Sequence, residues 1–433
     1  MATLVAEPRR VAGPGLRSRI AALRDRHARL WSSTAPLLPR LGPATGWRRR
    51  FFNGRAAGRL IDDLAADVDR LPDEPAERRA WQERVRENVQ SFGAARLDWP
   101  DGYRRLLFAD AFYTSALAFA RAARACHPEL PAESLWQGLR NVLIGNSLQV
   151  LLDREVALRP GLFAYSMLYP LTDNLLDDPC LPAAEKRAFN ERFGRRLAGR
   201  PAPAGESLDP AVFAMVARIE EEFPRAAFAD VWESLLAIHA AQARSLLQQG
   251  EVGLADDEVL AISCEKGGTS VLADLLLVTG GAAAPQESFA FGFGVCLQLL
   301  DDLQDVESDL EAGHETLFTR AARLGPLDEP TARLARFVEG VVEGADAVAG
   351  AAYADRRDLV RRNCLTLLVG AVAEHPDRFT RRFRRAIERQ WPLSLRTLRR
   401  LRRRAEARAR EASRALRARG GASSLLDLAI ALA

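Results

Sequence analysis

Apolar residues recur along most of this chain at intervals of three and four residues, which is the spacing of an amphipathic helix. Between the breaks the chain is rich in alanine, leucine, arginine and glutamate, which favour helix. No series of alternating strands interrupts this pattern. It predicts helices over residues 15–30, 59–70, 77–92, 104–125, 132–157, 162–178, 183–198, 209–221, 225–249, 256–279, 286–309, 330–350, 355–374, 376–390 and 394–418. We therefore expect an all-α protein, a bundle of roughly ten core helices.

The same pattern divides the chain into three regions. Residues 1–95 begin loosely and are expected to be helical or partly disordered, residues 96–375 form the main α-bundle, and residues 376–433 form an arginine-rich helical tail. No run of 18 or more apolar residues occurs, so we predict no membrane span. No continuous apolar stretch follows the first arginines, which predicts a cytoplasmic location rather than secretion. The five cysteines show no metal-ligand spacing and are expected to be reduced.

Charge is unevenly distributed along the chain. The net charge is +4, and Arg378–Arg419 holds 17 arginines against three acids, so the remaining body is acidic. Such a segment suits membrane phosphates, an acidic partner or the acidic body itself. It matches no recognised nucleic-acid fold and has few aromatic residues for base stacking, so no nucleic-acid partner is expected. Peripheral membrane contact through this segment is one expectation, and a solvated helix that caps the bundle is an equal alternative.

A first group of acids ends an apolar run from Phe163 to Leu176. It reads Asp173-Asn174-Leu175-Leu176-Asp177-Asp178. Asp173 and Asp177 are four residues apart and therefore share one helix face, about 6 Å apart along the axis, while Asp178 borders that face. Taken alone, this group is more simply interpreted as a solvated helix end.

A second acidic group follows another apolar helix. It consists of Gln298, Asp301, Asp302, Asp305 and Asp309. Asp301, Asp305 and Asp309 form one stripe on a helix, with Asp302 beside it and Gln298 one turn earlier. At an effective dielectric near 20, two like charges about 4 Å apart repel by roughly 4 kcal/mol. Two such groups facing one cavity predict either protonated acids or a bound divalent cation, and Mg²⁺ prefers such oxygen ligands together with substrate phosphate.

Three further features could bring cations to these acids. Lys266 precedes a glycine pair at 267–268, which inside a helix costs roughly 1–2 kcal/mol relative to alanine. We therefore expect a helix break beside a cavity with Lys266 facing an anionic oxygen; a kink with a solvent-facing lysine is the alternative. His314 lies in a loop expected to close over the site, although a lone histidine is more often a surface residue. Arg195 and Arg196 could hold a diphosphate bidentately, although a solvated face is the simpler interpretation.

Over roughly residues 135–320 these motifs resemble the class I isoprenoid synthase superfamily. The resemblance implies a helical bundle around a central apolar cavity, in which two acidic motifs hold three Mg²⁺ ions, with Mn²⁺ as an alternative, and bind a prenyl diphosphate. Gln298-x-x-Asp301-Asp302-x-x-Asp305 resembles the second aspartate-rich motif of prenyl diphosphate synthases. Lys266-Gly267-Gly268-Thr269 looks like their diphosphate-contacting lysine segment. Gly313-His314-x-Thr316-Leu317 is similar to their glycine-lysine-x-threonine-leucine segment, with His314 where lysine is usual.

The first motif points to a different subgroup. Asp173-Asn174-x-x-Asp177 resembles the large terpene synthases of the tetraprenyl-beta-curcumene synthase type, and is also similar to the acidic motif of squalene and phytoene synthases. Asp301, Asp305 and Asp309 share the ligand spacing of the terpene cyclase metal motif, with aspartate at all three positions. No Arg-Arg-Gly closely follows the first motif, which argues against chain elongation with isopentenyl diphosphate.

The resemblance implies a Mg²⁺-dependent class I terpene synthase that ionises a prenyl diphosphate to a terpene hydrocarbon or alcohol. The metal ligands would be Asp173, Asp177, Asp178, Asp301, Asp305 and Asp309, with Asp302 among the catalytic acids. The substrate-binding residues would be Lys266, Gln298, Asn174, Arg195, Arg196 and His314. A prenyltransferase that makes a longer isoprenoid is the first alternative, and a non-catalytic helical protein that binds partners or membrane through its basic tail is the second. The sequence leaves a homodimer open.

Overall fold

A computed structural model describes residues 14–69, 74–176, 181–202, 209–249, 253–344 and 353–418 of this chain, and these are helical almost throughout. The helices are α1 (Leu16–Ser33), α2 (Trp47–Asp69), α3 (Pro75–Leu97), α4 (Asp101–Leu107), α5 (Asp110–Cys126), α6 (Ala132–Leu151), α7 (Pro160–Leu176), α8 (Ala183–Leu197), α9 (Asp209–Glu222), α10 (Ala229–Ser245), α11 (Asp256–Thr279), α12 (Ala284–Gln304), α13 (Val306–Ala312), α14 (Leu317–Leu324), α15 (Asp328–Glu343), α16 (Tyr353–Glu374), α17 (Arg381–Glu388) and α18 (Leu395–Ala418). Over these ranges the only pairing of extended backbone is an isolated bridge between Gln249 and His314, and there is no sheet. The all-α prediction is confirmed.

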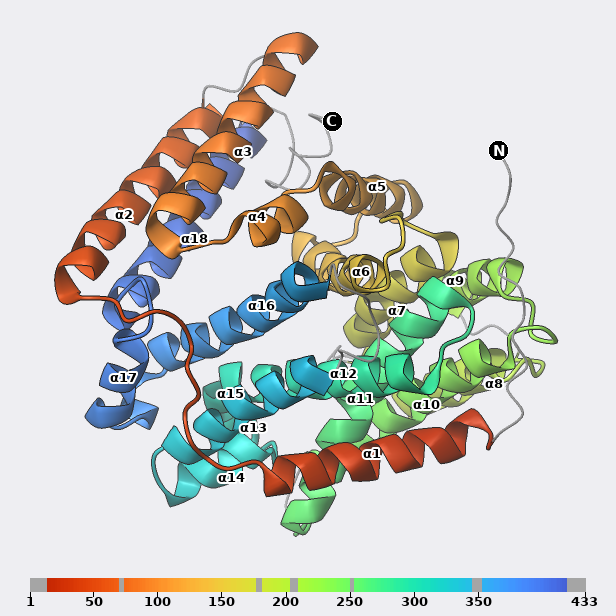
Figure 1. Cartoon of the computed structure of the whole chain (residues 1–433). Helices are drawn as coiled ribbons and strands as arrows, with labels where there is room; N and C mark the ends of the chain where they lie inside the picture. Colours follow the sequence, from red (N-terminus) through yellow and green to blue (C-terminus); the bar gives the residue numbers. More distant parts are fainter. Residues whose placement is uncertain are drawn as a thin grey trace.

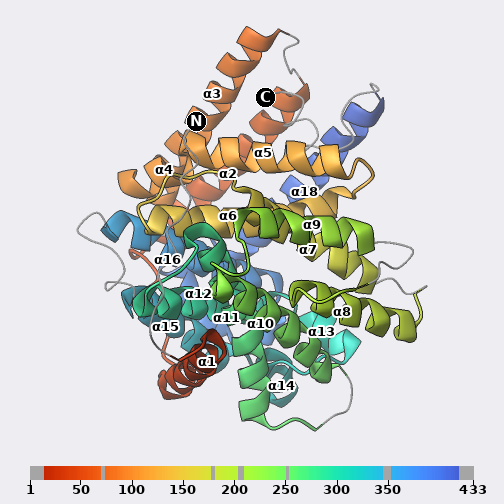
Figure 2. The same ribbon diagram turned by 90° about the vertical axis from the view of Figure 1, so that its right-hand side faces the viewer.

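Helix α11 forms the centre of the bundle. Its second half, Val271–Thr279, is buried on every side, as expected of a helix surrounded by protein. Helices α12, α10, α1, α6 and α7 pack around it (Figures 1 and 2). The α11–α12 pair is the most extensive helix contact in the described chain. Residues placed on these two helices therefore occupy the interior of the molecule.

Glycine residues set the distance between α11 and α12. A Cβ on Gly294 would lie 2.0 Å from Gly267 O, and a Cβ on Gly267 would lie 2.3 Å from Gly294 O. A Cβ on Gly268 would lie 2.4 Å from the Phe291 ring. The helix break expected at the glycine pair is therefore wrong: α11 runs unbroken through it, and the glycines allow two backbones to touch.

Helices α2, α3 and α18 project from one side of the bundle (Figure 1). The arginine-rich α18 packs along α2 and α16. Arg404 forms an ion pair with Asp62 of α2, and Arg399 and Arg403 each lie 3.9 Å from Glu374 of α16. Part of the positive charge of the predicted tail is thus directed at acids of the protein's own body.

Several predicted helix boundaries differ from the structure. The helix predicted over 132–157 is too long, because α6 ends at Leu151. The predicted helix 104–125 is divided between α4 and α5, and Asp110 lies in the first turn of α5, where a negative charge favours a new helix start. The predicted helix 286–309 is divided at Asp305, which caps both α12 and α13. Helix α14 and the first half of α2 were not predicted.

One stretch of the described chain, Asp101–Cys126, is long and apolar enough by length and composition to cross a membrane. No such span was predicted, and core helices of soluble proteins meet the same criterion. Here the stretch is two separate helices, with Phe108 and Ala109 between them.

Candidate functional site

Helix α7 lies antiparallel to α11, and this register determines where its acidic end lies. Near the start of α7, a Cβ on Gly161 would lie 3.4 Å from Leu277. Two turns later the Tyr169 hydroxyl lies 2.6 Å from the Ser270 hydroxyl. One further turn along each helix pairs position 173 with position 266, because both helices advance about 1.5 Å per residue. The acidic end of α7 and Lys266 therefore lie at the same level of the bundle.

The first acidic group is only partly within the described residues. Asp173 and Asn174 belong to the last turn of α7, and the description of both stops at their helical backbone. Asp177 and Asp178 lie outside the described residues. The ligand roles proposed for the first group therefore stay predictions.

Helix α12 is also antiparallel to α11, and it brings the second acidic group to the same end. Gly294 touches Gly267, and two turns later Asp302 accepts a hydrogen bond from the Ser263 hydroxyl at 3.2 Å. The Gln298 amide donates to the other oxygen of Asp302 at 2.8 Å. The turn of α11 that contains Ser263 and Lys266 therefore faces the second acidic group.

Asp302 is the buried member of this group, with a relative exposure of 6%. Burial, which disfavours the charged form, raises its pKa to about 7. The Gln298 hydrogen bond and the charge of Lys266 lower the pKa, and the charges of Asp301 and Asp309 raise it. The pKa of Asp302 therefore depends on the charges of Lys266 and of two other acids of the motif.

Asp305 and Asp309 are closer to solvent, and their pKa values are also raised. Burial makes the largest contribution for both, followed for Asp305 by repulsion from Asp301 and Asp309. The imidazole Nδ1 of His314 lies 3.2 Å from Asp309 Oδ1, which lowers the pKa of Asp309 but does not offset the other effects. Four acids, Lys266 and His314 thus form one electrostatic group at the end of α12.

This group fits a divalent cation in its chemistry but does not form a complete metal site by itself. Within the described ranges, no set of three or more histidine, cysteine, aspartate or glutamate side chains converges on a common point. The oxygens of Asp301, Asp305 and Asp309 are ligands that Mg²⁺ prefers. The pKa values of Asp305 and Asp309 are raised first by burial, and the like charge of Asp301 adds to this for both.

The segment after α13 is tied to the region before α11. His314 pairs with Gln249, and Glu315 N donates to Gln248 O at 2.8 Å. Glu315 also forms ion pairs with Arg320 at 2.6 Å and with Arg323. The loop predicted to close over the site is therefore anchored at both sides, with His314 directed at Asp309.

Arg195 and Arg196 have other partners in the structure. Arg195 is exposed, and its Nε donates to Pro201 O at 2.9 Å. Arg196 forms an ion pair with Glu220 at 2.9 Å, and Glu220 is shared with Arg225. These contacts join α8 to α9 and to the turn that follows it. They supply a structural role for Arg196 that the sequence did not indicate.

A buried polar network that was not predicted lies about two turns along α11 from Lys266. Asp274 is fully buried, and its Oδ1 accepts a hydrogen bond from Asn141 at 2.9 Å, while Asn141 also donates to Ser166 at 3.0 Å. Burial raises the pKa of Asp274 well above its usual range, and the hydrogen bond from Asn141 offsets only part of this effect. In the sequence, the feature that could have indicated this network is Asp274, a lone acid in the apolar run Val271–Val278.

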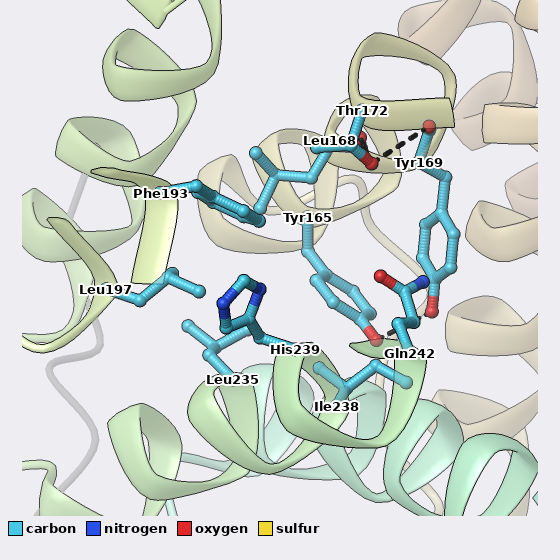
Figure 3. A pocket seen from close by; sticks show the side chains of 10 residues that line it. All are labelled: Tyr165, Leu168, Tyr169, Thr172, Phe193, Leu197, Leu235, Ile238, His239 and Gln242. Atoms are coloured by element: carbon cyan, nitrogen blue, oxygen red, sulfur yellow. Dashed lines mark hydrogen bonds between the residues drawn. The ribbon is translucent and has the colours of Figure 1, made fainter. Parts of the chain in front are cut away.

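A small cavity adjoins this network between α7, α8 and α10. Its volume is about 30 Å³, and its lining residues are Tyr165, Leu168, Tyr169, Thr172, Phe193, Leu197, Leu235, Ile238, His239 and Gln242 (Figure 3). The Tyr165 and Tyr169 hydroxyls lie 2.7 Å apart. The lining is mostly apolar and aromatic, and its Tyr169 end is one turn from the level of Lys266.

Comparison with known proteins adds no family to this description, since no protein-family model and no curated protein matches the chain.

Proposed function

We propose that this protein is a Mg²⁺-dependent class I terpene synthase acting on a prenyl diphosphate, in a bundle of the isoprenoid synthase type. One observation carries the proposal. The antiparallel registers of α7 and α12 on α11 bring the described end of α7 and the second acidic group to the level of Lys266, whose charge lowers the pKa values of Asp302 and Asp309. Acids at unrelated positions on the surface would not support it.

The residues of this site have distinct tasks in the proposed reaction. Asp301, Asp305 and Asp309 supply oxygens for Mg²⁺, together with the acidic end of α7. The bound metal would neutralise the diphosphate as the C–O bond breaks. Lys266 binds a diphosphate oxygen directly, which stabilises the negative charge that develops on the leaving group. Gln298 and Ser263 hold Asp302 in place through their hydrogen bonds.

The apolar part of the substrate would occupy the cavity between α7, α8 and α10. The rings of Tyr165 and Tyr169, with centroids 5.2 Å apart, offer aromatic faces to a carbocation. A volume of about 30 Å³ has room for little more than a water molecule or two. Binding of a prenyl chain therefore requires these three helices to move apart.

The decisive experiment measures diphosphate release and product mass. Purified protein is incubated with Mg²⁺ and prenyl diphosphates from C10 to C35, and products are read by mass spectrometry. We expect release of diphosphate with a product of unchanged carbon number. A longer product would instead assign the prenyltransferase, which the Gln298-x-x-Asp301-Asp302 segment also fits. No release from any substrate, and no change in stability with Mg²⁺ and diphosphate, would refute both.

Matched variants identify the residues responsible. Asp301→Asn and Lys266→Met should each lower diphosphate release by at least tenfold, since removal of one group that stabilises transition-state charge typically costs 10²–10³. The controls are Asp63→Asn, an exposed acid on α2, and Lys186→Met, the other lysine of the chain. Equal loss in a control and in its matched site variant would contradict the assignment.

A further inference from the structure

The first turns of α2 expose an aromatic face that no described part of the chain covers. Trp47, Phe51 and Phe52 have relative exposures of 68%, 54% and 59%. The Phe51 and Phe52 ring centroids lie 5.6 Å apart, and Trp47 is one turn from Phe51. Single exposed apolar residues are ordinary at protein surfaces, whereas three large aromatic side chains on adjoining turns indicate an interaction surface.

The packing of α2 explains why this face points outward. An adjoining side of the helix, farther from its start, is buried against α18: a Cβ on Gly54 would lie 2.8 Å from Thr397 Cγ2, and one on Gly58 would lie 3.9 Å from Leu401. The buried Asn53 amide donates to Pro392 O at 3.0 Å. The helix is therefore held by one side, and Figure 1 shows it at the edge of the molecule beside α17.

Arginine residues interleave with the exposed rings. Arg48, Arg55 and Arg59 are exposed on the same side of α2, and the Arg48 guanidinium lies 5.4 Å from the Trp47 ring centroid. The first acids of α2 are Asp62 and Asp63, beyond these residues. We call Trp47, Arg48, Phe51, Phe52, Arg55 and Arg59 the aromatic–arginine face.

The adjoining helix α17 extends the positive charge of this face. Thr45 N donates to Arg389 O at 2.7 Å, and Arg50 donates to Glu388 O at 2.8 Å, so the end of α17 lies against the start of α2. Exposed arginines of this helix and its end are Arg381, Arg382, Arg385 and Arg389. A partner for this region must therefore be apolar at short range and negatively charged around it.

We propose that the aromatic–arginine face docks the protein on an anionic phospholipid membrane. Tryptophan and phenylalanine rings enter the boundary between headgroups and acyl chains, while arginine side chains reach the lipid phosphates. A membrane fits better than nucleic acid, because the rings lie on one short, convex helix face and line no groove for successive bases. The inference is independent of the proposed function, because it uses none of the residues of the acidic group.

Vesicle binding of the full chain tests this proposal. The protein is mixed with vesicles of phosphatidylcholine alone or with about one third phosphatidylglycerol, and bound protein is separated by flotation. We expect binding to the anionic vesicles only, and weaker binding at high salt. The triple variant Trp47→Ser/Phe51→Ser/Phe52→Ser should bind at least tenfold more weakly, and each of Arg48→Gln, Arg55→Gln and Arg59→Gln roughly fivefold more weakly.

A second exposed aromatic pair provides the control. Tyr113 and Trp136 have relative exposures of 47% and 50% and lie on α5 and α6, so Tyr113→Ser/Trp136→Ser should bind vesicles as the unchanged protein does. Circular dichroism confirms that each variant is folded. No binding to anionic vesicles, or equal binding by the α2 triple variant, overturns the proposal. A dimer or a nucleic-acid complex that the triple variant abolishes, without vesicle binding, would also overturn it and assign the face to that partner.

Discussion

Replacement of Gly294 by alanine tests the helix contact on which the site depends. The new Cβ would lie 2.0 Å from Gly267 O and 2.7 Å from Gly267 C, which are backbone atoms of α11. A backbone carbonyl cannot rotate away as a flexible side chain can. Since ordinary C···O contacts are about 3.3 Å or longer, α11 and α12 must separate by roughly 1 Å at this point.

The expected cost follows from two opposing effects. Overpacking of a buried contact typically costs about 1–3 kcal/mol, and separation of the largest helix pair adds lost packing along both helices. Alanine gains about 1 kcal/mol over glycine inside a helix. We therefore expect Gly294→Ala to lower the free energy of unfolding by about 1–3 kcal/mol. Gly267→Ala should do the same, and the double variant should cost less than the sum, because both Cβ atoms push the same two helices apart.

Urea denaturation followed by circular dichroism measures this effect. The matched control is Gly340→Ala in α15, where a Cβ would meet nothing within 4 Å; it should raise stability by roughly 0.5–1 kcal/mol. If Gly294→Ala were as stable as Gly340→Ala, the close approach of α11 and α12 would be disproved. The unbroken α11 would then need another explanation for its glycine pair.

Two further predictions concern charged groups of α11 and α12. Burial raises the pKa of Asp302 from 3.8 to about 7. Between these pH values the folded state binds more protons than the unfolded state. The free energy of unfolding therefore falls as pH rises through this interval, by up to about 4 kcal/mol. Urea midpoints in EDTA should therefore fall from pH 5 to pH 8 more steeply in the unchanged protein than in Asp302→Asn, and parallel curves would contradict the assignment. Glu265 is 17% exposed and holds Arg24 of α1 and Arg244 of α10, each at 2.7 Å. Glu265→Gln should lower the unfolding free energy by about 1–3 kcal/mol, whereas Glu87→Gln, an exposed position in the middle of α3, should not change the urea midpoint.

The helical pattern was sufficient to predict the fold class and most helix positions. The prediction for 256–279 matches α11, because a long apolar run between an acidic start and a glycine end is unambiguous. The predicted helix 286–309 was too long, because Asp305 fits the same period on either side of the bend. Helix α14 has only eight residues, and its start depends on the Thr316 cap, a signal too short for periodicity to reveal.

The site was predictable only where residues lie close in sequence. The spacing of Asp301, Asp305 and Asp309 placed them together, and their mutual effect on pKa agrees with that. Ser263 could not be predicted as a partner of Asp302, because the two residues are 39 positions apart and their contact depends on the register of α11 against α12. Arg195 and Arg196 lie near the first acidic group in sequence, but in the structure they contact Pro201 O and Glu220 instead. Composition cannot reveal which of many arginines faces a given acid.

The glycine contact and the raised pKa of Asp302 have one physical origin. Close approach of α11 and α12 excludes water from the turn between Gly267 and Asp302, and the loss of hydration raises the pKa of the carboxyl group. Lys266 is near enough to offset part of this cost but not all of it. Apolar residues of similar size at these positions would stabilise the bundle at least as well. A fold that keeps Lys266 and the buried Asp302 beside this helix contact bears a cost that stability alone does not explain, and a charged ligand of the kind proposed would offset it.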